Sequence, residues 1–265
     1  MKKCLTVILV LATVLCSLYA GGGKEANTIT VGATPAPHAQ MLELVKDDLA
    51  AQGYKLVIKV FEDYVLPNDA VESGDIDANF FQHIPYMNQF NAEKGYHLVN
   101  AGGIHVEPLA VYSKKIAKLA DLADGATIAV PNDATNEGRA LLLLQSAGLI
   151  TLKDSSNLTS TKEDIASNPK NIKIVEMEAA SLPRMLGDVD AAVINGNYAI
   201  EAGLTAAKDG LFVEGADSPY VNIIAVKAGN EDSPAIKALV KALQSAEVKN
   251  WVKATYPNGD VVAVF

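Results

Sequence analysis

The sequence predicts an α/β protein made of two similar lobes with a cleft between them. Three observations predict this fold class. Short β-rich runs alternate with helical stretches from residue 27 onward, the alternation starts again near residue 126, and one turn motif occurs twice. Such alternation is typical of a mostly parallel sheet with helices on both faces. A chain of 265 residues, 49% of them hydrophobic, is long enough to form two lobes with separate cores.

The first half of the chain begins with a predicted strand, because residues 28–33 (TITVGA) are rich in β-branched side chains. A helix is expected at residues 40–52, where Met41, Leu44 and Leu49 recur on one helical face. Further strands are expected at residues 55–62, 77–81 and 106–113, and further helices at residues 66–73 and 85–94. This alternation begins with the order βαβαβ and continues with one more helix and strand.

The second half repeats this order, beginning with a strand at residues 126–130 (ATIAV) and an apolar helix at residues 135–147. The polar stretch 151–170 is the least regular part, with a weak helix at residues 162–167. The remaining strands are expected at residues 172–177, 190–194 and 221–229, and the remaining helices at residues 179–186, 234–245 and 247–253.

The turn motif that occurs twice joins a helix to a strand. The stretches ESGDIDANFF and MLGDVDAAVI, about 113 residues apart, share the pattern Gly-Asp-apolar-Asp-Ala. Gly74 and Gly187 suit left-handed helix C-caps, and the aspartates suit turns in which short side chains bind local backbone groups. A single unit of this kind is common, but two of them within matched βαβ order indicate two lobes of similar construction.

Aromatic and amide side chains follow the strands of both lobes. Phe80, Phe81 and His83 come at the end of one strand, and Asn195 and Asn197 follow another. In open α/β sheets, ligands bind beyond the carboxyl ends of the strands. We therefore expect these residues to face one another across a cleft between the lobes.

The charge balance argues against one class of partner. The formal net charge is -9, the isoelectric point is about 4.9, and the longest basic run in the body of the chain is Lys114-Lys115. Such an acidic protein is poorly suited to non-specific binding of nucleic acid or anionic lipid. We expect no nucleic-acid partner.

Residues 1–20 resemble an export signal. Two lysines precede an uncharged apolar run at residues 5–15, and the polar, glycine-rich stretch 21–28 then forms a short tether. Both cysteines of the chain, Cys4 and Cys16, lie in the signal region. The exported body therefore contains no disulfide and depends on its core for stability.

Cys16 ends the apolar run in the stretch TVLC, which is similar to a lipobox, the motif whose cysteine becomes the lipid-modified N-terminus. Leu15 occupies the position usually held by Gly, Ala or Ser. We expect lipidation at Cys16 and anchoring to the membrane through the lipid. Cleavage after Ala20, which would give a soluble secreted protein, is the alternative.

The chain carries no pattern typical of an enzyme or a metal centre. It has no His-x-x-x-His spacing, no Gly-x-Ser-x-Gly elbow and no phosphate-binding Gly-x-x-x-x-Gly-Lys loop. His105 and Glu107 could supply two metal ligands, but alternate residues of a strand also share a face for packing reasons. The paired aspartates of the repeated turn precede their strands, at the end opposite the expected cleft. We predict no enzymatic activity, no metal and no cofactor.

Arg139 is one of two arginines, against twenty lysines. It lies near the start of the helix at residues 135–147, where a cation opposes the positive end of the helix dipole. A bound anion would offset this cost, and a guanidinium can hold a carboxylate with two parallel hydrogen bonds. Arg139 is therefore a candidate for binding a ligand carboxylate. Pairing with Glu137, Glu178 or another acidic residue is the alternative.

Three asparagines near the predicted cleft, Asn195, Asn197 and Asn222, can bind both ends of a zwitterion. An amide oxygen accepts from an ammonium group, and an amide nitrogen donates to a carboxylate. Together with a buried guanidinium, they suit a small molecule that carries both charges.

Aromatic residues supply an apolar wall for the same molecule. Tyr64, Phe80 and Phe81 are candidates, although neighbouring residues of a strand point to opposite faces, so one phenylalanine should face the core. His83 and His105 are candidate hydrogen-bonding residues of the cleft, with a structural role as the alternative for each. The set favours a zwitterion with a medium-sized apolar side chain.

Four stretches resemble the NlpA lipoprotein family, the methionine-binding component of bacterial methionine ABC importers: FEDYVLPNDAVESGDIDANFFQHIPYMNQF, HVEPLAVYSKKI, VPNDATNEGRALLLLQSAGLI and INGNYAIEAGL. The resemblance extends from about Ile29 to Trp251. It implies the periplasmic-binding-protein fold, in which two crossing strands join two α/β lobes. The crossings are expected near residues 111–115 and 223–227. Lobe 1 then comprises residues 29–112 and 227–265, and lobe 2 comprises residues 113–226.

The resemblance also implies individual roles. Arg139 would hold the carboxylate of the amino acid, helped by Asn136 and Asn195. The polar end would also be bound by Asn197 and Asn222, and the thioether side chain would be surrounded by Tyr64, Phe80, Phe81, His83 and His105.

The implied ligand is L-methionine, and the implied partners are an ABC permease and its ATPase, so this chain needs no nucleotide. Ligand binding would close the lobes. We expect a monomer on the periplasmic, or extracytoplasmic, face of the cell membrane. Three alternatives remain at this point: a receptor for another small apolar amino acid, a surface antigen or adhesin with a vestigial cleft, and a two-lobed enzyme.

Overall fold

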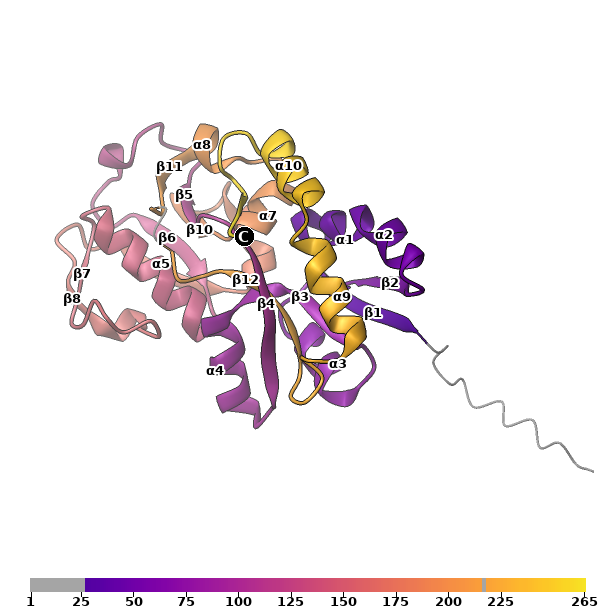
Figure 1. Cartoon of the computed structure of the whole chain (residues 1–265). Coiled ribbons are helices and arrows are strands. Elements are labelled where there is room, and N and C mark those ends of the chain that lie inside the picture. The colour runs from indigo at the N-terminus through magenta and orange to yellow at the C-terminus, as the bar shows by residue number, and fades with distance from the viewer. Residues whose placement is uncertain (1–26, 216–217) are drawn as a thin grey trace, which may run out of the picture.

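The computed structural model describes residues 27–215 and 218–265, whose strands form two large sheets and a small hairpin. A six-stranded sheet and its helices form lobe 1, and a five-stranded sheet and its helices form lobe 2 (Figure 1). Two crossing segments join the lobes. The α/β fold with two lobes, predicted from the sequence, is confirmed.

Lobe 1 has the strand order β13-β4-β12-β3-β1-β2. Within it, β2 and β3 are each parallel to β1, and β12 is antiparallel to both of its neighbours. The strands are β1 (Thr28–Ala33), β2 (Lys55–Val60), β3 (Ala78–His83), β4 (Leu98–Val106), β12 (Asn222–Lys227) and β13 (Val262–Ala263). The helices are η1 (Pro35–Ala39), α1 (Gln40–Leu44), α2 (Lys46–Ala51), α3 (Leu66–Ser73), α4 (Ile84–Lys94), α9 (Pro234–Leu243) and α10 (Ala246–Thr255).

Lobe 2 has the strand order β11-β5-β10-β6-β9, and the hairpin β7–β8 lies beside it. The strands are β5 (Ala110–Tyr112), β6 (Thr127–Pro131), β7 (Thr151–Leu152), β8 (Ile165–Ser167), β9 (Lys173–Met177), β10 (Ala191–Ile194) and β11 (Gly210–Val213). The helices are η2 (Leu119–Asp121), α5 (Ala134–Ser146), η3 (Lys162–Asp164), η4 (Ala179–Ser181), α6 (Leu182–Met185), α7 (Gly196–Glu201) and α8 (Ala206–Asp209).

The two sheets share one arrangement, as the repeated turn motif indicates. The order β2-β1-β3-β12 in lobe 1 corresponds to β9-β6-β10-β5 in lobe 2, with three parallel strands followed by an antiparallel one. The second aspartate of each motif accepts a hydrogen bond from the backbone of a neighbouring strand. Asp77 accepts a hydrogen bond from the backbone N–H of Thr30 (2.6 Å), and Asp190 accepts one from Thr127 (2.8 Å).

The two glycines of the motif differ, however. Gly74 caps α3 with φ of 85°, as predicted, whereas Gly187 has no positive φ. The prediction of a left-handed cap at Gly187 is wrong because α6 is a single short turn. The chain leaves it in the right-handed conformation at Leu186 and continues into a turn closed by Met185.

The crossings lie a few residues earlier than expected. The first is at residues 107–109, because Ala110–Tyr112 already pairs with β10 and β11 of lobe 2. The second lies between Val213 and Asn222, because β12 pairs with β3 and β4 of lobe 1. The expected divisions at residues 112 and 227 are therefore corrected. A β-rich run predicts that a strand forms. The sheet to which this strand belongs depends on the other strands with which it pairs.

Strand β4 was not predicted, because the pair Gly102-Gly103 lowers the β-propensity of its centre. The structure explains one of these glycines. A Cβ atom at Gly102 would lie 2.5 Å from Cγ1 of Val240, so glycine lets α9 pack closely on β4. The helix expected at residues 40–52 is divided at Val45 into α1 and α2. The short elements α7, α8, β11 and β13 were also not predicted.

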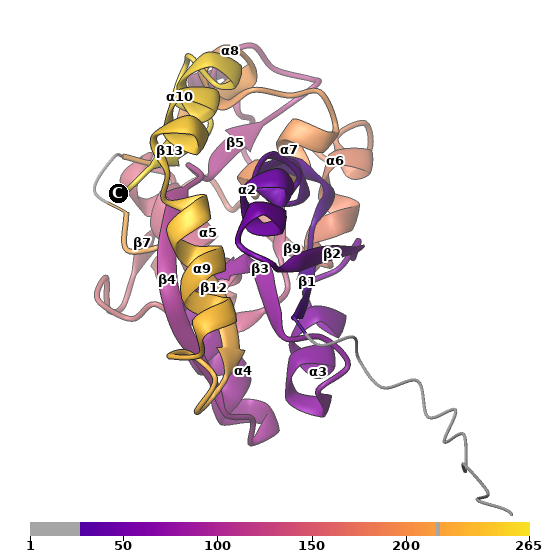
Figure 2. The same ribbon diagram turned by 45° about the vertical axis from the view of Figure 1, so that its right-hand side comes forward.

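Each lobe has its own core. In lobe 1, Leu49 and Val31 pack with Val248 and Val252 of α10, so the C-terminal helices return to the first lobe as expected. Figure 2 shows α9 along the lobe 1 sheet and α10 extending toward α8. Across the part of the chain that the structure describes, no helix is long and apolar enough to cross a membrane. The predicted signal sequence and Cys16 lie outside the described residues.

Candidate ligand-binding site

A small cavity lies between the two lobes. Eight of the ten predicted binding residues line it, namely Tyr64, Phe81, His83, Asn136, Arg139, Asn195, Asn197 and Asn222. Four residues that were not predicted to bind a ligand complete the wall: Gln82, Tyr86, Glu107 and Gly196.

The fold brings these residues together at the ends of strands. Asn222 on β12 is in register with His83 on β3 and with His105 on β4, so the three lie side by side at one end of the lobe 1 sheet. The lobe 2 residues come from the N-terminal ends of α5 and α7, which directly follow β6 and β10. This is the position at which α/β sheets bind ligands.

Arg139 lies in the cavity wall and is only 4% exposed. Its Nε donates to Oε1 of Glu214 (2.9 Å), and its Nη2 donates to Oε2 of Glu214 (2.5 Å) and to the backbone oxygen of Glu107 (2.8 Å). The two-pronged edge of the guanidinium therefore holds an internal carboxylate. The expectation that the two-pronged edge of Arg139 binds the ligand carboxylate is therefore corrected. The alternative, pairing of Arg139 with an acidic residue of the protein, is found instead, and the pair lies at the cavity.

A chain of hydrogen bonds sets the orientation of the amides. The Nδ2 of Asn136 donates to both carboxylate oxygens of Asp133 (2.9 and 3.0 Å), so its Oδ1 remains to accept other hydrogen bonds. That oxygen accepts from Nδ2 of Asn195 (2.8 Å) and from Nε2 of His83 (3.3 Å). The Oδ1 of Asn195 is consequently directed away from Asn136. It is buried and has no hydrogen-bond partner among the described residues.

His83 has a defined proton position. Its Nδ1 accepts from the backbone N–H of Tyr86 (3.2 Å) and caps α4, so the ring proton is on Nε2, which donates to Asn136. Burial, reinforced by the nearby charge of Arg139, lowers the pKa of His83 to about 3. His83 is therefore a neutral donor near pH 7 that connects lobe 1 to lobe 2.

Asn197 uses the other end of its amide: Asn195 donates through Nδ2, whereas Asn197 accepts through Oδ1. Its Oδ1 accepts from the hydroxyl of Tyr64 (2.5 Å), a contact from lobe 1 to lobe 2. Its Nδ2 is buried and forms no hydrogen bond of ordinary geometry within residues 27–215 and 218–265, although it lies near the carboxylate of Glu201. Two residues of the cavity wall thus carry a buried polar atom that forms no ordinary hydrogen bond in the described structure, an acceptor on Asn195 and a donor on Asn197. Buried polar atoms without partners are costly, which makes these two amides candidates for contact with a polar ligand.

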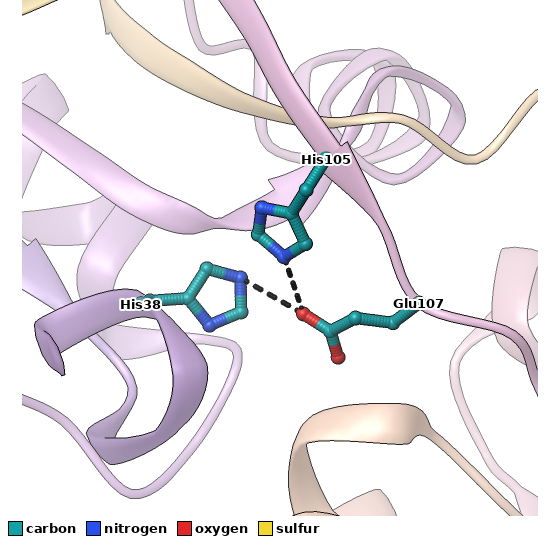
Figure 3. A group of neighbouring side chains, drawn as sticks. All are labelled: His38, His105 and Glu107. Carbon is teal, nitrogen blue, oxygen red and sulfur yellow. Dashed lines mark hydrogen bonds and ion pairs between the residues drawn. The ribbon is translucent and has the colours of Figure 1, made fainter. Parts of the chain in front are cut away.

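Glu107 lies at the first crossing and contacts both lobes. Figure 3 shows the rings of His38 and His105 directed at one of its carboxylate oxygens, Oε1, at 3.3 and 2.6 Å. On the other side, a Cβ atom at Gly196 would lie 2.6 Å from Cβ of Glu107, so glycine is needed where α7 begins. Burial raises the pKa of the Glu107 carboxyl, and the neighbouring His38 and Arg139 oppose this rise.

The three residues His38, His105 and Glu107 offer donor atoms within 4.8 Å of one another, a spacing that a metal ion could use. The 2.6 Å separation of His105 Nε2 and Glu107 Oε1 is, however, a hydrogen-bond distance. Neutral imidazole N–H groups therefore satisfy the carboxylate directly. We interpret the group as a hydrogen-bond network at the crossing.

Comparison with known proteins agrees with this arrangement. The sequence model of the family described as NlpA lipoprotein matches residues 29–265.

The chain belongs to the NlpA lipoprotein family.

Individual relatives in this family are similar along most of their length. A Pasteurella multocida protein named "Probable D-methionine-binding lipoprotein MetQ" is 48% identical, over 92% of this chain and 94% of that protein. A lipoprotein structure from Ruminococcus gnavus is 53% identical, with a TM-score of 0.88, over 91% of this chain and 100% of that one. A Burkholderia cenocepacia nutrient-binding protein, solved bound to methionine, is 48% identical, with a TM-score of 0.86, over 89% and 100% of the two chains.

Two of the predicted site residues of this NlpA-family chain lie outside the cavity wall. Phe80 is fully buried in the core of lobe 1, with its ring edge-on to His38 at 4.7 Å, whereas Phe81 faces the cavity. The expectation that one of the two rings faces the core is therefore confirmed, and Phe80 is that ring. His105 lies behind Glu107, so its predicted contact with the ligand side chain is replaced by support of the carboxylate.

Sequence reasoning missed Glu214 and the role of Glu107. Glu214 follows a strand that was not predicted and lies 75 positions from Arg139, so no local pattern connects the two. Glu107 was considered only as a possible metal ligand beside His105. The one available signal was the proximity of Glu107 to Pro108, because a proline next to a β-rich run often marks the point where a strand ends.

We expect His105→Gln to change the pH dependence of stability. Burial lowers the folded-state pKa of His105 from 6.5 to about 3. Between these values, the unfolded state binds a proton that the folded state does not, so this histidine destabilises the fold as the pH falls. The free energy of unfolding of the wild type should therefore fall, relative to the variant, by up to about 1.4 kcal/mol per pH unit between about pH 6 and pH 4. Urea unfolding across this range measures the difference, and parallel pH profiles would contradict the buried neutral state of His105.

Proposed function

We propose that this protein captures methionine in the cavity between its lobes and delivers it to an ABC importer, without chemical turnover. The observation that carries the proposal is one cavity between the lobes whose wall combines the Arg139 guanidinium, the amides of Asn195 and Asn197 and several aromatic rings, with the buried Oδ1 of Asn195 accepting no hydrogen bond in the described structure. A zwitterionic amino acid offers an ammonium group to Asn195 and a carboxylate to Arg139 and Asn197. The names of related proteins, which include methionine-binding lipoproteins, support methionine as the amino acid.

The polar groups suggest how the two ends of the ligand are bound. Nη1 of Arg139 and Nδ2 of Asn197 would donate to the carboxylate, and Oδ1 of Asn195 would accept from the ammonium group. The carboxylate of Glu107, which also lines the cavity, adds a negative charge for the ammonium end. Asn136 would act through Asn195, because its own amide is committed to internal hydrogen bonds.

The apolar end of the ligand would lie against aromatic rings. Tyr64, Phe81 and Tyr86 line the cavity and pack on one another, with ring centroids 5.6 to 6.0 Å apart. A polarizable thioether makes favourable contacts with aromatic rings. These rings come from lobe 1, and the carboxylate donors Arg139 and Asn197 come from lobe 2, so the ligand would contact both lobes.

Contacts between the lobes support a closing mechanism. Tyr64 donates to Asn197, His83 donates to Asn136, and Tyr198 donates to the backbone oxygen of Glu62 (3.1 Å). A ligand that binds groups of both lobes stabilises the closed state relative to an open one. We propose that a membrane permease and its ATPase recognise the closed form.

Calorimetric titration tests the proposal. The purified protein would be unfolded and refolded to remove carried ligand, and then titrated with L-methionine, D-methionine, leucine and glutamate. We expect one methionine per chain and weaker binding of leucine and of charged glutamate. Nuclear magnetic resonance of the mixture should show unchanged methionine after prolonged incubation. Failure of both methionine enantiomers to bind, or conversion of methionine to a product, would exclude the proposed function.

We also propose that the mature protein is held at the extracytoplasmic face of the membrane by a lipid on Cys16. Membership of a lipoprotein family supports this proposal. Mass spectrometry of the mature N-terminus should find a diacylated cysteine, and Cys16→Ser should release the protein into the soluble fraction. An unmodified N-terminus at Gly21 would show instead that cleavage follows Ala20.

A further inference from the structure

Glu214 occupies the edge of Arg139 that a ligand carboxylate would otherwise use. Nε and Nη2 of Arg139 form two parallel hydrogen bonds with the two oxygens of Glu214, at 2.9 and 2.5 Å. This is the bidentate geometry that gives arginine–carboxylate pairs their strength and their fixed direction. The arginine side chain is 4% exposed and the glutamate side chain 16%, so solvent screens the pair only weakly.

The other sides of the guanidinium are also in contact with protein. The backbone oxygen of Glu107 accepts a further hydrogen bond from Nη2, at 2.8 Å. The ring of Tyr220 covers one face, with its centroid 4.2 Å from Cζ. Within residues 27–215 and 218–265, no hydrogen bond to Nη1 is present, and Arg139 lines the cavity. The guanidinium therefore presents Nη1 to a ligand while its remaining edges are fixed.

Glu214 is itself fixed to both crossings between the lobes. Its backbone N–H donates to the backbone oxygen of Leu109 (2.8 Å), and its Oε2 accepts from the backbone N–H of Leu109 (3.2 Å). Glu107 and Leu109 belong to the first crossing, and Glu214 begins the second. Arg139 of lobe 2 is thus attached to the part of the fold about which the lobes would move.

We propose that Glu214 is a positioning residue for the binding site: it holds Arg139 so that Nη1 faces the ligand carboxylate, and it neutralises the arginine charge so that the site selects a zwitterion. This inference rests on the proposed function. Arg139 and Glu214 together carry no net charge, and a ligand with a second carboxylate would add an unbalanced negative charge to the cavity. Displacement of Glu214 by the ligand is disfavoured, because it would leave a largely buried carboxylate without its partner.

The substitution Glu214→Gln distinguishes two roles of Glu214: positioning of Arg139 for the ligand, and competition with the ligand carboxylate for Arg139. It replaces one carboxylate oxygen with an amide nitrogen, which cannot accept from the guanidinium, and it removes the negative charge. If Glu214 positions Arg139, binding of L-methionine should weaken about 10-fold to 100-fold, as for loss of a hydrogen bond to a charged group. The penalty for glutamate relative to L-methionine should shrink, because the extra positive charge favours a dicarboxylate.

Glu176→Gln is the matched control. Glu176 pairs with Lys162 in lobe 2, is partly buried like Glu214, and lies outside the cavity wall. Its variant should bind L-methionine as the wild type does, and circular dichroism should confirm that both variants fold. Unchanged or tighter methionine binding by Glu214→Gln, with wild-type binding intact, would overturn the positioning role and leave the proposed function standing. Absence of methionine binding by the wild type would overturn both.

A second measurement does not depend on a variant of Glu214. Because the chain has two arginines, a protein labelled with ¹⁵N-arginine gives two Nε–H resonances, and the exposed Arg184 provides the reference. Substitution of Arg184 by lysine assigns them. The Arg139 Nε–H should exchange slowly with water and keep its chemical shift when L-methionine is added, while its Nη resonances shift. A large methionine-induced change at Nε would show that the ligand displaces Glu214, and would overturn the inference.

Discussion

Replacement of Arg139 by alanine is expected to weaken methionine binding by about 2 to 5 kcal/mol, which corresponds to a roughly 30-fold to several-thousand-fold increase in Kd. The variant loses the Nη1 donor. It also leaves the carboxylate of Glu214, which is largely buried, without its partner and close to the carboxylate of the ligand. Both effects oppose binding of an anion. Calorimetric titration of refolded protein measures the change.

Arg184→Ala is the control for this experiment, because Arg184 is the other arginine of the chain and is exposed on α6. Its affinity should equal that of the wild type. The double variant Arg139→Ala/Glu214→Gln removes the unpaired charge and should recover part of the stability, but not the affinity. Wild-type affinity in Arg139→Ala would show that the guanidinium does not bind the ligand, and would remove the physical basis of the carboxylate site.

Replacement of Phe80 by alanine is expected to lower the free energy of unfolding by about 3 to 5 kcal/mol, the usual cost of removing a fully buried phenylalanine. Phe80 is 0% exposed and packs in the core of lobe 1, where its ring contacts the rings of His38 and His105. The cavity wall is formed by Phe81 instead. The folded fraction of Phe80→Ala should therefore keep an affinity much closer to that of the wild type than Phe81→Ala does.

Urea unfolding of the two variants measures their stability, and calorimetric titration measures their affinity for methionine at equal folded concentration. Phe81→Ala should lose roughly 1.5 to 3 kcal/mol of binding free energy, because the aromatic wall that covers the ligand side chain is removed. If Phe80→Ala loses more affinity than Phe81→Ala at equal folded concentration, then the assignment of Phe80 to the core and Phe81 to the cavity is incorrect.

Elements with a strong periodic pattern were predictable from the sequence. The strand β1 and the helix α3 have the predicted bounds, α4 begins one residue earlier than predicted, and α5 both begins and ends one residue earlier. Their apolar residues repeat with the period of the element, so local preference and tertiary packing agree. Strand β4 was not predictable in this way, because Gly102 is explained by a helix, α9, that lies far along the chain.

The candidate site shows the same division. The position of His83, Asn195 and Asn197 after predicted strands was enough to place them at a cleft, because parallel strands deliver their carboxyl ends to one edge. The direction of each amide was not predictable. It depends on Asp133, which orients Asn136, and on Tyr64, which comes from the other lobe to bind Asn197.

Residue order and residue type were enough to predict the class of fold, the similarity of the two halves, the edge of the sheets at which the cavity lies and a set of candidate residues for binding a zwitterion. These properties follow from hydrophobic periodicity and from residue type, which are local. Three features became visible in the folded structure: Glu214 binds the two-pronged edge of Arg139, Phe80 packs in the core while Phe81 faces the cavity, and the chain crosses between the lobes at residues 107–109 and between Val213 and Asn222. Hydrogen bonds between distant segments and the choice of strand partners leave no periodic trace in the chain, so only the folded arrangement specifies them.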